Sequence, residues 1–431
     1  MANPVERTPN PVEIRTLTSS DEFPEWLRAV STGFFRGPTV GEKEVSVRAL
    51  GTELDRIQGA YDGGRCVGTF RTLPQSLTVP GGAVLPACAV SGVTVSPTHR
   101  RRGLLTGMMA NALGAAKERG DACATLIAAE YPIYGRYGFG PAAWTTEWEV
   151  LIARTGLDRR YAGPADLGDG GRVELVDAAE FRARMPAVHE RFRTGPQRQG
   201  AIDRDEKWWR TATGDLRFPD DGFTPPFHAV YRDADGQPQG GVTYHASEDL
   251  WQAKQPELTV SVRDLFATTV AGEAALWRYV LAMDWVQRIR TGLRAPDDVL
   301  PLLLPDPRAA RTVTHADWLW IRPLDVPRMM AARTYAVEGT LVLEVRDKDG
   351  YAGGRFKLEA AGPLGGARCA ASREEPELSL DVSELGSLFL GGESAVRLAA
   401  LGRLAEHREG AAEWAEVLFR TARRPWCQDV F

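Results

Sequence analysis

Hydrophobic positions in the first third of the chain switch repeatedly between the two-residue spacing of strands and the wider spacing of helices. A helix is predicted over 103–118, where Leu104, Met108 and Leu113 recur on or near one side. Strands are predicted at 56–61, 65–73, 84–95 and 122–129. Strands that alternate with helices are typical of an α/β fold, so we expect one such domain over residues 1–155.

The middle of the chain repeats this order. Strands near 226–232, 239–247 and 256–267 come before a helix near 272–286. The distance from turn to helix is about 40 residues in both segments, which indicates a weak internal structural repeat. Asp203 and Glu206 have the capping-box spacing ahead of a further helix that carries Trp208 and Trp209. We therefore expect a second α/β domain over residues 156–312.

The last segment, 313–431, combines strand patterns with two or three helices and indicates an α+β domain. One of these helices is predicted to carry three leucines: Leu398, Leu401 and Leu404. The sequence then ends in a non-helical tail, 424–431. Chain ends commonly fray, but the large apolar residues Trp426 and Phe431 predict a tail that is docked against protein.

Composition narrows the range of functions. The net charge of −5 argues against nucleic-acid binding and against attachment to a membrane surface. No apolar run approaches the ~18 residues of a membrane span, and no signal-like apolar core opens the sequence, so we expect a cytoplasmic protein. The five cysteines and six histidines are scattered without the spacing of a disulfide framework or a zinc site, so no metal is expected.

Basic residues gather where the predicted strand 84–95 passes into the predicted helix. Arg100, Arg101 and Arg102 stand directly before Gly103 at the mouth of this helix. The start of a helix offers unpaired N–H groups and the positive end of the helix dipole, and a glycine lets the backbone approach a phosphate closely. Arginines add paired hydrogen bonds to phosphate. The pattern indicates an anion-binding site, with a solvated basic turn as the alternative interpretation.

Two motifs carry a resemblance to a known family. The run Arg100-Arg101-Arg102-Gly103-Leu104-Leu105 resembles the phosphate-binding motif of the GCN5-related N-acetyltransferases, and most closely that of the Eis (enhanced intracellular survival) family. Leu105 stands where the general motif has a small residue. The run from Ile133 to Gly140, Ile-Tyr-Gly-Arg-Tyr-Gly-Phe-Gly, is similar to a second Eis element. The resemblance implies two tandem acetyltransferase domains, the second degenerate, followed by a sterol-carrier-like domain.

The resemblance also implies roles for particular residues. Tyr134 would be the general acid, and the terminal carboxylate of Phe431 the general base. A tyrosine can donate a proton without carrying a charge at neutral pH, although Tyr134 is equally interpretable as a packing aromatic between glycines. The residues implied in binding acetyl-CoA are Val93, Thr94, Val95, Arg101, Arg102, Gly103, Leu104, Leu105, Thr106, Ala129 and Glu130.

The sequence alone does not identify the molecule that accepts the acetyl group. The resemblance implies acetylation of aminoglycosides, other polyamines or protein lysines, in a homohexamer, and Phe34, Phe35 and Asp429 are candidates for recognising an amine. The middle segment lacks an R-x-x-G run after its own third strand, so it is not expected to bind a second acetyl-CoA. A non-catalytic carrier of lipids or small molecules, built on the last domain, is the alternative outside enzymes.

Overall fold

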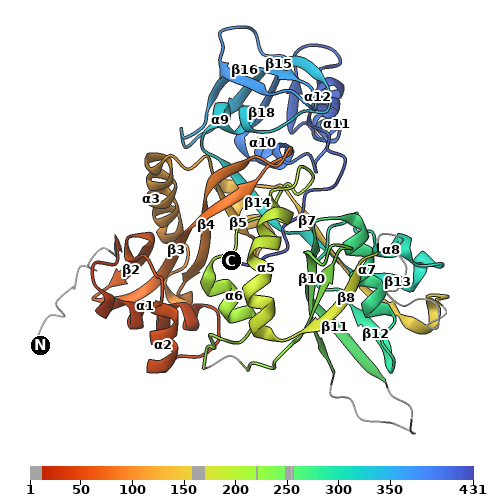
Figure 1. The fold of residues 1–431 in the computed structure, drawn as a ribbon. Helices are drawn as coiled ribbons and strands as arrows, with labels where there is room; N and C mark the ends of the chain where they lie inside the picture. Colours follow the sequence, from red (N-terminus) through yellow and green to blue (C-terminus); the bar gives the residue numbers. More distant parts are fainter. Residues whose placement is uncertain (1–11, 158–169, 220–221, 248–253, 255–256) are drawn as a thin grey trace, which may run out of the picture.

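Three β-sheets organise the chain in the computed structural model, which describes residues 12–157, 170–219, 222–247, 254 and 257–431 (Figure 1). The first two sheets lie side by side in the lower part of the view, and the third lies above them. The predicted combination of two related α/β folds and a different α+β fold is confirmed.

The first sheet contains strands at all four positions predicted in this part of the chain. Its strands, in spatial order, are β1 (Glu13–Thr16), β2 (Ile57–Asp62), β3 (Arg65–Thr78), β4 (Val84–Val95), β5 (Cys123–Ile127), β14 (Leu319–Pro323) and β6 (Gly140–Pro141). The helices of this part are α1 (Phe23–Gly33), α2 (Glu42–Ala49), α3 (Leu104–Arg119) and α4 (Tyr131–Tyr134). Helix α3 buries Leu104, Met108 and Leu113 against the sheet, as its spacing predicts.

The second sheet has the same central pattern, a parallel pair of strands flanked by antiparallel ones. Its strands, in spatial order, are β13 (Ala310–Asp317), β7 (Trp144–Leu151), β12 (Val286–Arg290), β11 (Leu258–Ala267), β10 (Pro238–Ala246), β9 (Phe227–Arg232) and β8 (Arg172–Val176). The accompanying helices are α5 (Ala178–Arg193), α6 (Glu206–Ala212), α7 (Val270–Leu281) and α8 (Leu300–Leu303). Helix α7 ends before the predicted 286, because Val286 already opens strand β12. Residue 256, the predicted start of β11, lies outside the described residues.

Strands cross the predicted limits of the segments. Strand β7 precedes residue 155 but belongs to the second sheet, and β14 follows residue 312 but belongs to the first. Strand β14 runs antiparallel beside β5, and all five of its residues are buried. It therefore covers an edge of β5 that would otherwise expose unpaired backbone groups. The first two sheets are thus joined by exchanged strands, and the limits at 155 and 312 stay predictions.

The third sheet supports the last part of the chain. Its strands, in spatial order, are β17 (Ala367–Ala371), β16 (Gly354–Ala361), β15 (Glu338–Arg346), β18 (Leu378–Asp381) and β19 (Leu404–Glu406). Its helices are α9 (Val326–Ala332), α10 (Val382–Phe389), α11 (Ala395–Ala400) and α12 (Ala411–Phe419). The prediction that three leucines share one helix is wrong: α11 ends at Ala400, Gly402 adopts φ +69° and Leu404 lies in β19. A positive φ of this kind ends a helix.

The predicted cap of α6 is also wrong. Asp205 caps this helix by accepting the Trp208 N–H at 2.6 Å, whereas Asp203 accepts the Ser76 N–H of β3 at 2.7 Å. The segment before α6 therefore ties the second part of the chain to the first sheet. No helix in the described residues is both long and apolar enough to cross a membrane.

Candidate active site

Strand β4 carries a bulge at the centre of the candidate site. Its pairing with β3 is regular up to Ser91 and resumes at Thr94, and Gly92 between them adopts φ +59°. The Thr69 hydroxyl donates to the Gly92 carbonyl at 2.8 Å and lies 2.7 Å from the Thr94 hydroxyl. A bulge of this type turns backbone groups out of the ladder. The backbone at Val93 is therefore available to a ligand.

The two parallel strands of the first sheet separate next to this bulge. Strands β4 and β5 pair only from Ala87 and Cys123 to Ala89 and Thr125. Beyond Ala89 the strand β4 continues through Val93, Thr94 and Val95 without a partner on this side, while β5 passes into the exposed residues Ala129 and Glu130. The residues of β4 and β5 that are predicted to bind the cofactor thus stand on opposite sides of a splayed pair of strands.

The start of α3 is uncapped and lies at the surface of the protein. Gly103 is the N-cap residue, with φ +79°, and no side chain caps the helix. A Cβ placed on Gly103 would meet no atom within 4 Å, so the space in front of the first turn is free. Arg101 and Arg102 are exposed, and neither makes an ion pair with the described residues. The first-turn residues Leu104, Leu105 and Thr106 follow directly. Free cations and free N–H groups at one helix start suit a pyrophosphate.

Tyr134 lies on the last turn of α4 and is 8% exposed. Its ring packs edge-on against Phe139, with the centroids 6.2 Å apart. Burial, aided by the nearby negative charge of Glu130, raises the pKa of Tyr134 above its ordinary value. The hydroxyl therefore keeps its proton at neutral pH, and among the described residues it makes no hydrogen bond. The hydroxyl of Tyr137, on the next turn, lies 3.2 Å from the Thr106 hydroxyl. This hydrogen bond links the turn to α3.

A buried arginine holds the Tyr134 turn from behind. Arg322 of β14 is fully buried, donates to the Tyr137 carbonyl at 2.8 Å and pairs with Asp347 of the third domain at 2.7 Å. A Cβ on Gly138 would lie 2.5 Å from the Arg322 Nε, so this glycine is required by the close approach. No sequence motif indicates this role of Arg322, because its partners lie far away in the chain.

The C-terminal tail is docked, as predicted. Trp426, Cys427 and Asp429 are buried, and the Trp426 N–H donates to the Gln199 carbonyl at 3.0 Å. The Trp318 indole donates to the Asp429 carbonyl at 3.1 Å. Figure 1 marks the end of the chain near the centre of the molecule, beside α5 and α6.

The contact with Trp318 places the tail relative to the first sheet. Trp318 directly precedes β14, whose Leu319 pairs with Ile127 at the end of β5. Phe431, only two residues after Asp429, packs against the core that contains Leu319. The tail thus brings Phe431 toward the end of β5, where the two parallel strands separate.

Asp429 itself is tied to the second domain. Its carboxylate accepts from Arg204 at 2.8 Å, and Arg204 also pairs with Asp264 of β11 at 2.7 Å. Burial raises the pKa of Asp429 to about 6, against the opposing effect of Arg204. One arginine therefore pairs with two carboxylates, and among the described residues the second Asp429 oxygen has no hydrogen-bond partner.

The aromatic candidates Phe34 and Phe35 lie at the rim of the same region. They follow the end of α1, where a Cβ on Gly33 would lie 2.4 Å from Thr94. Phe34 is 40% exposed and Phe35 79% exposed, with φ +56° at Phe35. Two exposed rings next to the β4 bulge are available to an incoming acceptor. In the described residues, no group of three or more His, Cys, Asp or Glu side chains is arranged to hold a metal.

Comparison with known proteins agrees with this geometry. Residues 13–142 and 200–330 match family models of the acetyltransferase (GNAT) domain, and residues 326–428 match the sterol carrier protein domain. The N-acetyltransferase Eis of Mycobacterium tuberculosis is 38% identical over 80% of this chain and 81% of that protein. The chain belongs to the Eis family of N-acetyltransferases.

Further relatives support the assignment. Eis1 from Mycobacterium abscessus superposes with a TM-score of 0.82 at 31% identity, covering 97% of this chain and 100% of that one. An uncharacterized N-acetyltransferase from Streptomyces griseus is 56% identical over 97% of this chain and 100% of that protein. This Eis-family chain is therefore an N-acetyltransferase, and its GNAT domains imply acetyl-CoA as co-substrate.

Proposed function

We propose that this Eis-family enzyme transfers the acetyl group of acetyl-CoA to amino groups of aminoglycosides or related polyamines. The observation that carries the proposal is the meeting of three features at one place: splayed strands, an uncapped helix start with exposed arginines, and a docked C-terminal tail. The first two features fit acetyl-CoA, and the third supplies negative charge on the side from which a cationic amine would enter.

In this proposal Arg101, Arg102 and the N–H groups of Gly103–Thr106 hold the pyrophosphate of acetyl-CoA. The backbone at Val93, freed by the bulge, stabilises the oxyanion that forms when the amine nitrogen attacks the thioester carbon. Ala129 and Glu130 border the same gap from β5. These roles are supported by the uncapped start of α3 and by the separation of β4 and β5 beyond Ala89 and Thr125.

The remaining roles concern protons. The Tyr134 hydroxyl donates its proton to the departing sulfur, so the carbon–sulfur bond breaks as a thiol forms. The carboxylate of Phe431 attracts the ammonium form of the acceptor and takes up its proton through water. An α-carboxylate, whose acid has a pKa of ~3.5, is too weak a base to take a proton directly from an ammonium group with a pKa of ~10. We therefore favour a carboxylate that positions the ammonium group and receives its proton through a water molecule. The exposed rings of Phe34 and Phe35 contribute aromatic surface for the amine, whereas Asp429 is buried and paired with Arg204.

An acceptor screen tests this function. The enzyme is given acetyl-CoA with an aminoglycoside, with spermidine or with a lysine-containing peptide, and mass spectrometry counts the acetyl groups added to each. We expect rapid acetylation of the first two and slow acetylation of the peptide. Faster reaction with the peptide would replace small polyamines by protein lysines as the substrate class. No acetyl transfer to any amine would contradict the proposal.

The role of Phe431 is tested by extending the chain. A C-terminal affinity tag converts the Phe431 carboxylate to an amide and should sharply lower the initial rate, while leaving the affinity for acetyl-CoA nearly unchanged. The same tag at the N-terminus is the control. Equal rates for the two tagged proteins would remove Phe431 from the mechanism.

A further inference from the structure

The first and second sheets can be compared residue by residue at the point where their parallel strands separate. In the first sheet the last parallel pair is Ala89 with Thr125. Val93 and Ala129 each follow four residues later, on the two sides of the gap that suits acetyl-CoA. Neither side chain is long enough to bridge this gap.

In the second sheet the last parallel pair is Ser261 with Arg290, and the residues four positions later are Leu265 and Arg294. The Arg294 guanidinium donates to the Leu265 carbonyl at 2.5 Å. The position that holds alanine in the first sheet thus holds an arginine that bridges the separated strands.

The close approach of two backbone segments also narrows the gap between β11 and β12. Gly292, two residues past the last pair, adopts φ +64°, and a Cβ on it would lie 2.6 Å from the Val262 carbonyl oxygen. The start of α7 is closed as well, because the Thr269 side chain caps it by accepting the Gly272 N–H at 3.1 Å. In the part of the chain that the structure describes, the gap of the second sheet and the start of α7 are thus both filled by protein groups.

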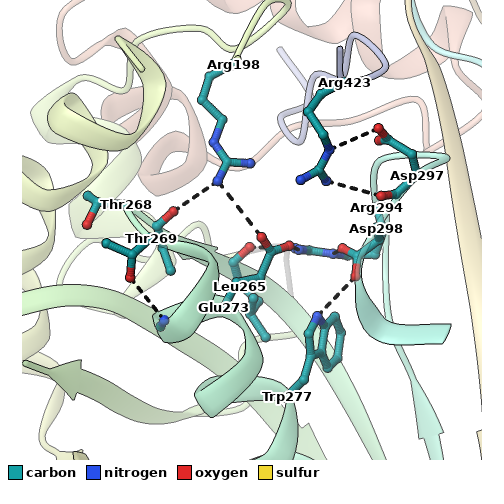
Figure 2. A network of polar contacts seen from close by, with 12 residues as sticks. Arg198, Leu265, Thr268, Thr269, Glu273, Trp277, Arg294, Asp297, Asp298 and Arg423 are labelled. Atoms are coloured by element: carbon teal, nitrogen blue, oxygen red, sulfur yellow. Dashed lines mark hydrogen bonds and ion pairs between the residues drawn. The ribbon is translucent and has the colours of Figure 1, made fainter. Parts of the chain in front are cut away.

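Arg294 is the centre of a balanced network of charges (Figure 2). Its guanidinium pairs with Asp298 at 2.8 Å and with Glu273 of α7 at 3.4 Å, and the Trp277 indole also donates to Asp298. Arg198 approaches Glu273 from the other side at 3.9 Å. Burial and the nearby Asp298 charge raise the pKa of Glu273. Arginines of the same domain therefore face both buried carboxylates, Asp298 and Glu273.

On its other side the network contacts the C-terminal tail. The Arg294 guanidinium carbon lies 4.8 Å from the centroid of the Trp426 ring, a cation–π contact. Asp297 accepts from the Arg423 side chain at 2.9 Å and from the Arg424 N–H at 2.9 Å. Gln199 adds two hydrogen bonds. Its side-chain amide donates to the Arg423 carbonyl at 2.5 Å, and its main-chain carbonyl accepts from the backbone N–H of Trp426 at 3.0 Å.

We propose that the second acetyltransferase fold has exchanged cofactor binding for docking of the C-terminal tail. Arg294 fills the former gap and, with Asp297, fixes the tail at Arg423 and Trp426, while Arg204 fixes it again at Asp429. Arg294 and Asp297 are positioning residues that act through Phe431. The docking stands on the contacts above, whereas the positioning role rests on the proposed function of the Phe431 carboxylate.

The test uses the Asp297–Arg423 pair, because removing Arg294 would leave two buried carboxylates unpaired and endanger folding. Asp297→Ala and Arg423→Ala each remove the same partly exposed pair, from the loop side and from the tail side. Asp215→Ala is the matched control: Asp215 pairs with Arg210 at 2.8 Å and with Arg182 at 3.2 Å in the second domain and is similarly exposed, but among the described residues it makes no hydrogen bond or ion pair with the tail.

Two measurements are made on each protein. Carboxypeptidase A removes a C-terminal phenylalanine only from an accessible tail, and mass spectrometry follows the loss of Phe431. We expect Asp297→Ala and Arg423→Ala to release Phe431 about three- to tenfold faster than the unmodified protein and Asp215→Ala, as loss of one partly exposed charged hydrogen bond implies. The kcat with a polyamine should fall by a similar factor, with the KM for acetyl-CoA unchanged.

The outcomes separate the two claims. Unchanged release of Phe431 in both variants would overturn the docking role of the second domain. Faster release with unchanged kcat would leave the docking in place and overturn both the positioning role and the function proposed for Phe431. In a chain that lacks Phe431, Asp297→Ala should cause no further loss of kcat, because the pair acts through that residue. A further equal loss there would show that Asp297 acts on activity by another route.

Discussion

The two acetyltransferase folds of this chain share a central architecture but use their charges in opposite ways. In the first, Arg101 and Arg102 are exposed beside an uncapped helix start. In the second, Arg294 is buried and pairs with Asp298 and Glu273 at the equivalent gap. The sheet alone therefore does not decide function. What decides it is whether polar groups at the splayed strands are left for a ligand or satisfied within the protein.

The helix starts show the same contrast. Gly103 gives α3 a left-handed cap residue and no side-chain acceptor, so its first N–H groups stay free. Thr269 gives α7 an extended cap residue whose side chain accepts the Gly272 N–H. A free helix start attracts an anion, whereas a capped one is already stabilised. A single residue at the cap thus distinguishes the proposed binding site at α3 from the helix start of α7, which is already capped.

The largest effect is expected from removing the proton donor of the first fold. Tyr134→Phe keeps the ring and its packing on Phe139 but removes the hydroxyl, so kcat should fall by about 10²- to 10⁴-fold, the usual contribution of a general acid. Isothermal titration should show unchanged acetyl-CoA affinity. Tyr244→Phe is the control in the second fold, where Tyr244 is equally buried and hydrogen-bonds only with Tyr279 among the described residues. Near-normal turnover by Tyr134→Phe would leave this tyrosine with a packing role.

A smaller effect, of about 10²-fold in the Kd of acetyl-CoA, is expected from Gly103→Glu. The new carboxylate would stand at the free helix start, where repulsion from a pyrophosphate a few ångströms away amounts to several kcal/mol at an effective dielectric constant of ~20. Gly236→Glu is the matched control: Gly236 has φ +75° against +79° for Gly103, and a Cβ on either meets nothing within 4 Å. Both variants carry the same backbone strain and charge. An equal change in Kd for the two would place the pyrophosphate elsewhere.

The sequence predicted the local elements of both folds well, because their signals are local. Strand β4 was predicted over the residues that form it, and the run Arg100–Gly103 was predicted at the mouth of α3. Strand β14 escaped prediction, since its place beside β5 depends on pairing with residues almost 200 positions away. The docking of the C-terminal tail is predictable only in part. Trp426 and Phe431 indicate that the tail packs against protein, but nothing in the sequence indicates which surface it contacts.

The buried arginines were the residues least accessible to sequence reasoning. Arg204 stands between the two residues of the predicted capping box, Asp203 and Glu206, yet its side chain joins Asp264 of β11 to Asp429 of the tail. Arg294 lies in no motif and is recognisable only by counting from the last parallel pair of the second sheet. Such residues acquire their roles from partners distant in the chain, whereas Arg101 and Arg102 are recognisable because their role depends on the adjacent glycine and helix.

The smallest effect concerns salt, and it tests the exposed charges of the first fold directly. Interactions of exposed charges are screened as the Debye length falls from ~14 Å at 0.05 M salt to ~4 Å at 0.5 M. We expect this change to weaken acetyl-CoA binding by about three- to tenfold in the unmodified enzyme. Arg102→Ala should weaken binding a few-fold at low salt and reduce the dependence on salt, because one phosphate contact is already lost.

Arg210→Ala, which removes an exposed arginine paired with Asp215 in the second domain, is the control and should behave as the unmodified enzyme. Titrations of the three proteins at both salt concentrations give the comparison. An unaltered salt dependence in Arg102→Ala would mean that this arginine does not contact the phosphates, and the contrast between the two folds would then depend on Gly103 and the helix start alone.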